Sequence, residues 1–112
     1  MRPIPKKLLK EILEDRFYQK CCVTGQNNVR LHHNFIYSGK QVNEKWCILP
    51  LSDEIHDIEK RKDIKEILNW IMYNRATDEE LLKYSKVVNY IERKEMSNLL
   101  FGKYKHNWYE KS

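Results

Sequence analysis

LHHNFIYSGKQVNEKWCILPLSDEIHD, residues 31–57, decides the fold of this chain and holds three of its four histidines. His32 and His33 are adjacent, and His56 follows after a glycine-containing turn and an apolar segment, Ile48–Leu51. A neutral imidazole can bind a metal ion or act as a base near neutral pH, depending on which ring nitrogen is free. A histidine pair that folds back onto a third histidine could therefore carry both a metal ion and a base, and we expect the rest of the chain to support this segment.

Two strands are predicted inside and just before this segment. Apolar and polar residues alternate over Val29–Ile36, which is typical of a strand. Tyr37–Lys40 contains a glycine and predicts a turn. A second strand is expected within Gln41–Leu51, centred on Trp46–Leu49 and ended by Pro50. Together these patterns predict an antiparallel hairpin.

A helix should follow the hairpin directly. Ser52, Asp53 and Glu54 offer an N-cap, and the helix is expected to run through His56, to Ile58 and beyond. The order strand, strand, helix would place the strand that carries the histidine pair opposite the helix that carries His56.

The histidine pair sets a geometric condition. Neighbouring residues of a regular strand point to opposite faces. His32 and His33 can face one site only if one of them lies at the edge of the strand or at a bend, which we expect where the chain turns at Asn34.

The flanking sequence predicts helices. One should begin near Pro5 and run to about Phe17, and another should cover Asp63–Tyr73. Thr77 and Glu80 form a capping box that begins a further helix. After a possible break near Ser85, helical spacing continues through Val87, Val88, Ile91 and Met96.

The chain is therefore expected to be an α+β protein with one domain. With 112 residues it has the length of a single domain. We place that domain at residues 1–101, with its core at 29–62, and expect a loose tail over 102–112, in which His106 is inert.

The charge of the chain favours a polyanionic partner. The net charge is +5 and the isoelectric point is about 9.1. Cations near phosphates release condensed counterions, so basic proteins favour nucleic acids. Charge alone is equally consistent with an ordinary solvated surface. Candidate phosphate contacts are Lys40 in the turn and the adjacent Lys60, Arg61 and Lys62.

The three cysteines do not indicate a disulfide framework. Cys21 and Cys22 are adjacent and Cys47 is distant, which favours a reducing, intracellular setting. A closed structural zinc site needs four ligands. Because Gly25 stands where Cys22 would need a cysteine partner, no structural zinc is expected. A zinc-binding adaptor built from Cys22, Cys47 and the histidines remains a weaker alternative.

Targeting signals are not expected. The N-terminus, MRPIPKKLLKEIL, is amphipathic and lacks the apolar region of a signal peptide. The chain has no apolar run near the roughly 20 residues of a membrane span. We expect a soluble, cytoplasmic protein with no membrane partner.

Residues 31–57 resemble the HNH endonucleases, members of the His-Me finger (ββα-metal) superfamily. The resemblance rests on L-H-H at 31–33, the hairpin, I-L-P-L at 48–51 and His56. More narrowly, the chain is similar to small phage-type HNH proteins. The similar flanking segments are R-P-I-P-K-K-L-L at 2–9, F-Y at 17–18, I-Y-S-G-K-Q-V-N-E-K-W at 36–46 and R-A-T-D-E-E-L-L-K-Y at 75–84.

The resemblance implies a metal-dependent DNA endonuclease, phage-encoded and working in the host cytoplasm, that holds mainly the DNA backbone. It implies that His33 is the general base and that His32 and His56 hold one divalent ion, Mg²⁺ or Mn²⁺, with Zn²⁺ or Ni²⁺ possible. The asparagine that orients the base in this family is expected near residue 47, where this chain has a cysteine. Asn43 or Gln41 of the hairpin could take its place.

A second function class remains open. The chain lacks the motif asparagine near residue 47 and the paired cysteines that brace many HNH sites with zinc. These departures favour a catalytically inactive HNH-fold protein that binds DNA or protein as a regulator.

Overall fold

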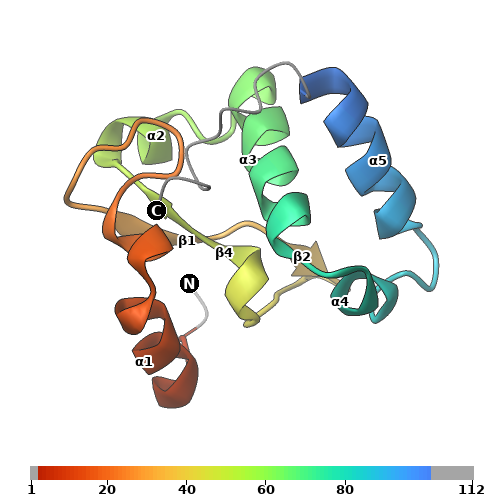
Figure 1. Cartoon of the computed structure of the whole chain (residues 1–112), viewed down its shortest axis with the longest axis horizontal. Helices are drawn as coiled ribbons and strands as arrows, with labels where there is room; N and C mark the ends of the chain where they lie inside the picture. The colour runs from red at the N-terminus through yellow and green to blue at the C-terminus, as the bar shows by residue number, and fades with distance from the viewer. Residues whose placement is uncertain (1–2, 102–112) are drawn as a thin grey trace.

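Two antiparallel strand pairs and five α-helices make up the described part of the protein, residues 3–101 of a computed structural model (Figure 1). The α+β class expected from the sequence is confirmed. In chain order the elements are α1 (Lys6–Glu14), the 3₁₀ helix η1 (Arg16–Gln19), β1 (Arg30–His33), β2 (Ile36–Tyr37), β3 (Lys40–Gln41), the 3₁₀ helix η2 (Lys45–Cys47), β4 (Ile48–Leu51), α2 (Asp53–Asp57), α3 (Lys62–Arg75), α4 (Asp78–Leu82) and α5 (Tyr90–Phe101). The expected tail, with His106, lies outside the described residues. No helix in the described range is long and apolar enough to cross a bilayer.

The predicted antiparallel pairing of the strand of the histidine pair with the strand around Ile48 and Leu49 is confirmed, but the two are not joined by a simple turn. β1 pairs with β4, and the short β2–β3 hairpin is a separate pair between them. The expected strand over Val29–Ile36 ends at His33, and the Asn34 backbone N–H donates to the carbonyl of Cys47, the residue just before β4, at 2.8 Å. The prediction of one continuous strand there was wrong.

β4 also differs in detail from its prediction. Trp46 and Cys47 lie in η2, not in a strand, and Pro50 lies inside β4 opposite Leu31. A two-stranded sheet has only edge strands, and an edge strand tolerates proline because no partner needs its missing N–H. All four residues of β4 are buried, so the apolar run reflects burial on both faces.

The turn of the β2–β3 hairpin agrees with its prediction. Ser38 and Gly39 connect the strands with φ values of 53° and 76°. Positive φ at both central positions is the geometry that matches the twist of a two-residue hairpin.

α3 is the central helix of the core. It lies between the β1–β4 pair and α5 (Figure 1), and it contributes the fully buried Leu68, Trp70, Ile71 and Met72. The predicted helix over Asp63–Tyr73 is confirmed with slightly wider bounds. α1 is shorter than predicted, because Phe17 lies in η1 after a break at Asp15.

Helix caps follow the predicted local chemistry. The Ser52 side chain accepts from the Ile55 N–H and begins α2, which ends at Asp57 and so does not extend past Ile58 as expected. The Thr77 and Glu80 capping box at α4 is confirmed, with both reciprocal hydrogen bonds present.

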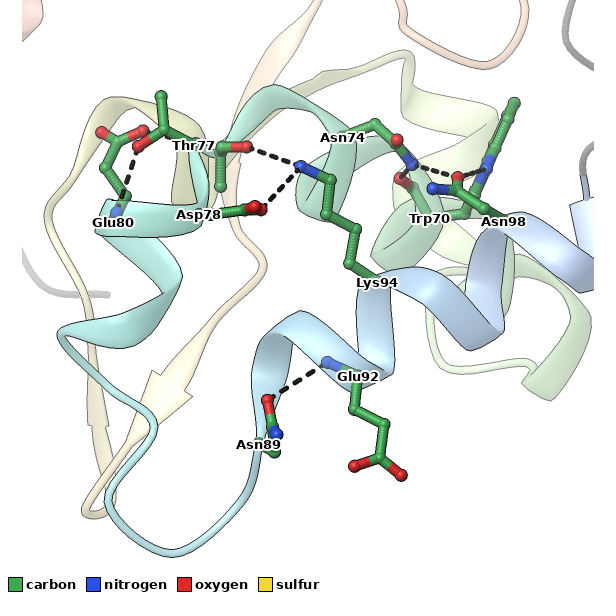
Figure 2. A network of polar contacts seen from close by, with 10 residues as sticks. Trp70, Asn74, Thr77, Asp78, Glu80, Asn89, Glu92, Lys94 and Asn98 are labelled. Carbon is green, nitrogen blue, oxygen red and sulfur yellow. Dashed lines mark hydrogen bonds and ion pairs between the residues drawn. The ribbon is translucent and has the colours of Figure 1, made fainter.

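α5 contacts α3 through a network of polar side chains (Figure 2) and through ring contacts, Trp70 with Phe101 and Tyr73 with Tyr90. It contains no buried residue. The Asn98 amide oxygen accepts from the Trp70 indole N–H at 3.0 Å and from Asn74 Nδ2 at 2.8 Å, and Lys94 Nζ donates to the Ala76 carbonyl at 3.2 Å. The helix predicted through Val87 begins only at residue 90, and the Val87 side chain is exposed.

Asp15 joins the N-terminal segment to the end of α3. Its carboxylate lies 2.8 Å from Lys45 Nζ and 3.5 Å from Arg75, and it accepts from the Phe17 N–H at 2.9 Å. Arg75 also lies over the Phe17 ring, 3.6 Å from its centroid. Partial burial raises the pKa of Asp15, but the hydrogen bonds from Lys45 and Phe17 and the two cations outweigh it and lower the pKa below its ordinary value.

We expect Asp15→Asn to destabilise the protein at neutral pH by about 0.5–1 kcal/mol, the range of partly exposed ion pairs. Because the pKa of Asp15 is lowered by folding, its contribution is present above the pKa of the unfolded chain and is lost as the pH falls through the folded pKa. Urea unfolding of both proteins at pH 7 and near pH 3 measures this. An equal difference at the two pH values would show that the charge of Asp15 is not responsible.

Candidate functional site

A pocket of about 330 Å³ lies where β1 ends beside the connection from α2 to α3. Its lining residues are His32, His33, Asn34, Ile36, Glu59, Lys60, Lys65 and Asn69. The adjacent histidines of the sequence therefore share one pocket. They do so because His33 is the last residue of β1, so the regular alternation of the strand ends there.

His33 is held in one tautomer by a chain of hydrogen bonds. Its Nε2 lies 2.6 Å from Asn43 Oδ1, and Asn43 Nδ2 donates to the Pro3 carbonyl at 2.9 Å. The carbonyl can only accept, so it fixes the amide with Oδ1 toward the ring. His33 Nε2 then carries the proton, and Nδ1 keeps its lone pair. The ring is buried, and Nδ1 has no hydrogen-bond partner within residues 3–101.

His32 is oriented by a second chain of hydrogen bonds. The Asn34 side-chain NH₂ donates to Asn69 Oδ1 at 3.0 Å and contacts Met72 Sδ at 3.4 Å. Asn34 Oδ1 is thereby left to accept from His32 Nε2–H, at 3.3 Å. His32 Nδ1 faces the Glu59 carboxylate, 2.7 Å from Oε2.

The contact between His32 and Glu59 brings two electron-rich atoms together. Burial lowers the pKa of His32 below its ordinary value, although the Glu59 carboxylate opposes this shift. In the neutral tautomer that donates Nε2–H to Asn34, Nδ1 presents its lone pair to the carboxylate. Glu59 Oε2 is itself buried and makes no hydrogen bond to a described residue. A cation that meets both atoms would remove their repulsion, and an imidazole nitrogen with a carboxylate oxygen is a donor set that suits Mn²⁺ or Zn²⁺ and also accommodates Mg²⁺.

His56, the expected second ligand, lies next to this pair without joining it. Its ring packs edge-to-face on the His32 ring with centroids 6.3 Å apart, and it does not line the pocket. Within the described range, no three histidine, cysteine, aspartate or glutamate side chains are arranged to hold a metal ion together. The donors that fit a metal ion best are His32 and Glu59.

Comparison of the chain with known proteins found no relative. Neither the family models, nor the curated proteins, nor the solved structures contain a match to this chain.

The structure separates the expected phosphate contacts. Lys60 lines the pocket of the histidines, whereas Arg61 makes two contacts with Asp63, at 3.2 and 2.8 Å, and borders a different shallow pocket with Lys62. Lys40 lies in the β2–β3 hairpin and lines a third pocket. The Lys60–Lys62 stretch is therefore not one continuous cationic patch.

Four polar lining residues were missed by sequence reasoning: Asn34, Glu59, Lys65 and Asn69. Lys65 has no ion pair in the described part of the chain and provides a second cation beside Lys60. Two spacings could have revealed some of them. Glu59 follows His56 by three residues, and Lys65 and Asn69 are one helical turn apart on α3.

The cysteines belong to the core. Cys47, where the resemblance led us to expect an asparagine, is fully buried and does not line the pocket, whereas Asn43 contacts His33 from the loop after β3. Cys22 is also buried, and its N–H donates to the Pro50 carbonyl at 3.0 Å. Burial raises the pKa of both the Cys22 and Cys47 thiols, which keeps them protonated.

Proposed function

We propose that the protein is a metal-dependent DNA endonuclease of the HNH type that hydrolyses phosphodiester bonds. The observation that carries the proposal is His33. Its Nε2–H is bonded to Asn43, and its Nδ1 is a buried base nitrogen without a partner among residues 3–101, beside a pocket shared with His32 and Glu59. A base nitrogen next to a cation-binding donor pair is the combination that metal-assisted hydrolysis requires.

The side chains of the pocket have separate tasks in this reaction. Lys60 and Lys65 attract the phosphate and balance the negative charge that grows during attack. His33 Nδ1 takes a proton from the attacking water. The proton on Nε2 stays in the hydrogen bond to Asn43, which steadies the imidazolium that forms.

A divalent ion would be held by His32 Nδ1 and Glu59 Oε2, with His56 as the nearest further donor. When bound, such an ion supplies Lewis-acid stabilisation of the leaving 3′ oxygen. The chain itself contributes the orientation of these donors, because Asn34 and Asn69 fix the His32 ring. Partners of this kind around a ligand histidine set its tautomer and its basicity.

The family proposal depends on the sequence resemblance and on the order of elements. β1, β4 and α2 follow one another in the order strand, strand, helix, and His33 and His56 lie on the first strand and the helix, as the resemblance implies. A phage origin, action in the host cytoplasm and backbone-directed DNA binding belong to the same proposal.

A second function is favoured by one observation. The described residues contain no group of three or more histidine, cysteine, aspartate or glutamate side chains placed to hold a metal ion. A protein of this fold that binds DNA without cutting it, as a regulator, would need no such group.

Plasmid nicking distinguishes the two functions. Supercoiled plasmid is incubated with the wild-type protein and with His33→Ala in Mg²⁺, Mn²⁺ or Ni²⁺. Metal-dependent nicking by the wild type that is lost in the variant supports the nuclease. DNA binding without nicking in every metal supports the regulator.

We expect Asn43→Ala to lower the nicking rate by about 10–1000-fold, because His33 loses the acceptor that fixes its tautomer. Asn43→Asp keeps an acceptor and should retain more activity than Asn43→Ala at neutral pH. Rates at saturating protein measure both variants. Equal rates for Asn43→Ala and the wild type would show that the contact does not orient the base.

A further inference from the structure

A second pocket, of about 580 Å³, lies against the β2–β3 hairpin. It is lined by Tyr37, Ser38, Lys40, Gln41, Val42, Asn43, Glu44, Lys83 and Tyr84. We call it the hairpin pocket. The proposed base, His33, and the proposed metal donors, His32 and Glu59, do not line it.

The hairpin presents its side chains in a fixed arrangement. Tyr37 and Lys40 are directly opposite each other in the β2–β3 register, so both side chains project from the same face. The connecting turn holds Ser38 at a φ of 53°, in the left-handed region that a side chain rarely adopts. This is the ordinary geometry of a two-residue hairpin turn, and it fixes the positions of Tyr37 and Lys40 on either side of the turn.

The hairpin pocket is electrostatically suited to an anion. Its one lining acid, Glu44, is already engaged: it accepts from the Trp46 indole N–H and the Tyr84 hydroxyl, and it lies 3.5 Å from Lys83 Nζ. Lys40 makes no ion pair with any residue in the range 3–101, and the Lys83 side chain is 66% exposed. The hairpin pocket therefore has a net positive charge: Lys83 balances Glu44, and the Lys40 ammonium group is left without an ion pair among the described residues.

The hairpin pocket is connected through Asn43 to the pocket of His32 and His33, which we call the catalytic pocket. Asn43 lines the hairpin pocket and bonds His33, which lines the other. Ile36 borders the catalytic pocket and its neighbour Tyr37 borders the hairpin pocket, so the hairpin stands between the two. A nucleic acid seated over His33 would therefore have this hairpin beside it.

We propose that the hairpin pocket binds a second backbone phosphate of the same DNA, through Lys40 and Lys83, with Tyr37 packing against the adjoining sugar or base. This inference rests on the proposed function, because it takes the DNA in the catalytic pocket as its starting point. Each phosphate that a lysine neutralises releases about 0.9 counterions. Binding through this pocket is therefore salt-dependent and independent of the metal ion.

The test measures DNA binding without cleavage. A fluorescein-labelled duplex is titrated in EDTA with the His33→Ala protein and with the same protein carrying Lys40→Ala and Lys83→Ala. The matched control carries Lys10→Ala and Lys86→Ala, which remove the same charge from exposed positions that line neither pocket. We expect the pocket variant to bind roughly tenfold more weakly and to lower the salt slope by between one and two, and the control to stay within about twofold.

The outcomes separate this inference from the nuclease. Equal affinities for the pocket variant and the control would overturn the second phosphate site, even if the wild type nicks plasmid. Weakened binding in the pocket variant alone supports the site, even if no metal supports nicking, in which case only the nuclease fails.

Discussion

Replacing His33 with alanine should lower the rate of plasmid nicking by about 100- to 10,000-fold, the usual contribution of a general base. His33 is the residue whose buried Nδ1 lone pair has no other use within the described structure. Without it, the attacking water must ionise unaided. Rates measured with protein in excess over plasmid report the chemical step and separate it from product release.

Added imidazole provides the control for this variant. The His33 side chain is only 4% exposed, so its removal leaves a space in which free imidazole can bind. Imidazole should restore part of the rate in His33→Ala and should not affect the wild type. His33→Gln, which fills more of the space, covers the case in which the alanine variant does not fold. A folded His33→Ala protein that nicks at the wild-type rate would exclude His33 as the base.

Replacing Glu59 with glutamine should weaken Mn²⁺ binding at least about tenfold, since even partners that only orient ligands contribute 10–100-fold. The change keeps the shape of the side chain and removes the charge that faces His32 Nδ1 at 2.7 Å. An amide oxygen is a weaker donor to a divalent ion than a carboxylate. Titration of Mn²⁺ followed by electron paramagnetic resonance measures the affinity without DNA or turnover.

Glu54→Gln is the matched control for this prediction. Glu54 is exposed in the first turn of α2, so its substitution removes the same charge away from the pocket. Mn²⁺ affinity should be unchanged in this control. If Glu59→Gln also binds Mn²⁺ like the wild type, Glu59 serves only as an ion-pair partner of a protonated His32.

The parts of the fold that the sequence predicted correctly are those decided by neighbouring residues. Ser52 caps α2, and Thr77 with Glu80 caps α4, because each hydrogen bond joins residues three apart. The turn at Ser38 and Gly39 is likewise local. Such contacts depend on no distant part of the chain, so short motifs predict them.

The strand pairing needed information from farther along the chain. β1 pairs with β4 across the inserted β2–β3 hairpin, and Pro50 remains within β4 because no third strand needs its N–H. A pattern of alternating residues indicates a strand, but it does not show that a further hairpin is inserted between two paired strands. The antiparallel pairing of the two strands was therefore predicted correctly, whereas the separate β2–β3 pair and the place of Pro50 inside β4 were not.

In the candidate site, too, local motifs were predicted from the sequence, whereas contacts between distant residues were not. The adjacent His32 and His33 are visible as a motif, and the role of Asn43 was considered because it lies in the expected hairpin. Its bond to the Pro3 carbonyl joins residues 40 positions apart. Glu59 could have been noticed from its spacing to His56, but its contact with His32 depends on how α2 packs against β1.

Conversion of supercoiled plasmid to nicked circles by the wild-type protein tests the central claim most directly. We predict nicking in Mn²⁺ that is abolished by EDTA and restored by excess metal ion, with nicks that DNA ligase seals because water attack leaves a 3′-hydroxyl and a 5′-phosphate. No conversion in Mg²⁺, Mn²⁺ or Ni²⁺, by protein that is folded and still binds the plasmid, would contradict the assignment of this pocket as a nuclease site.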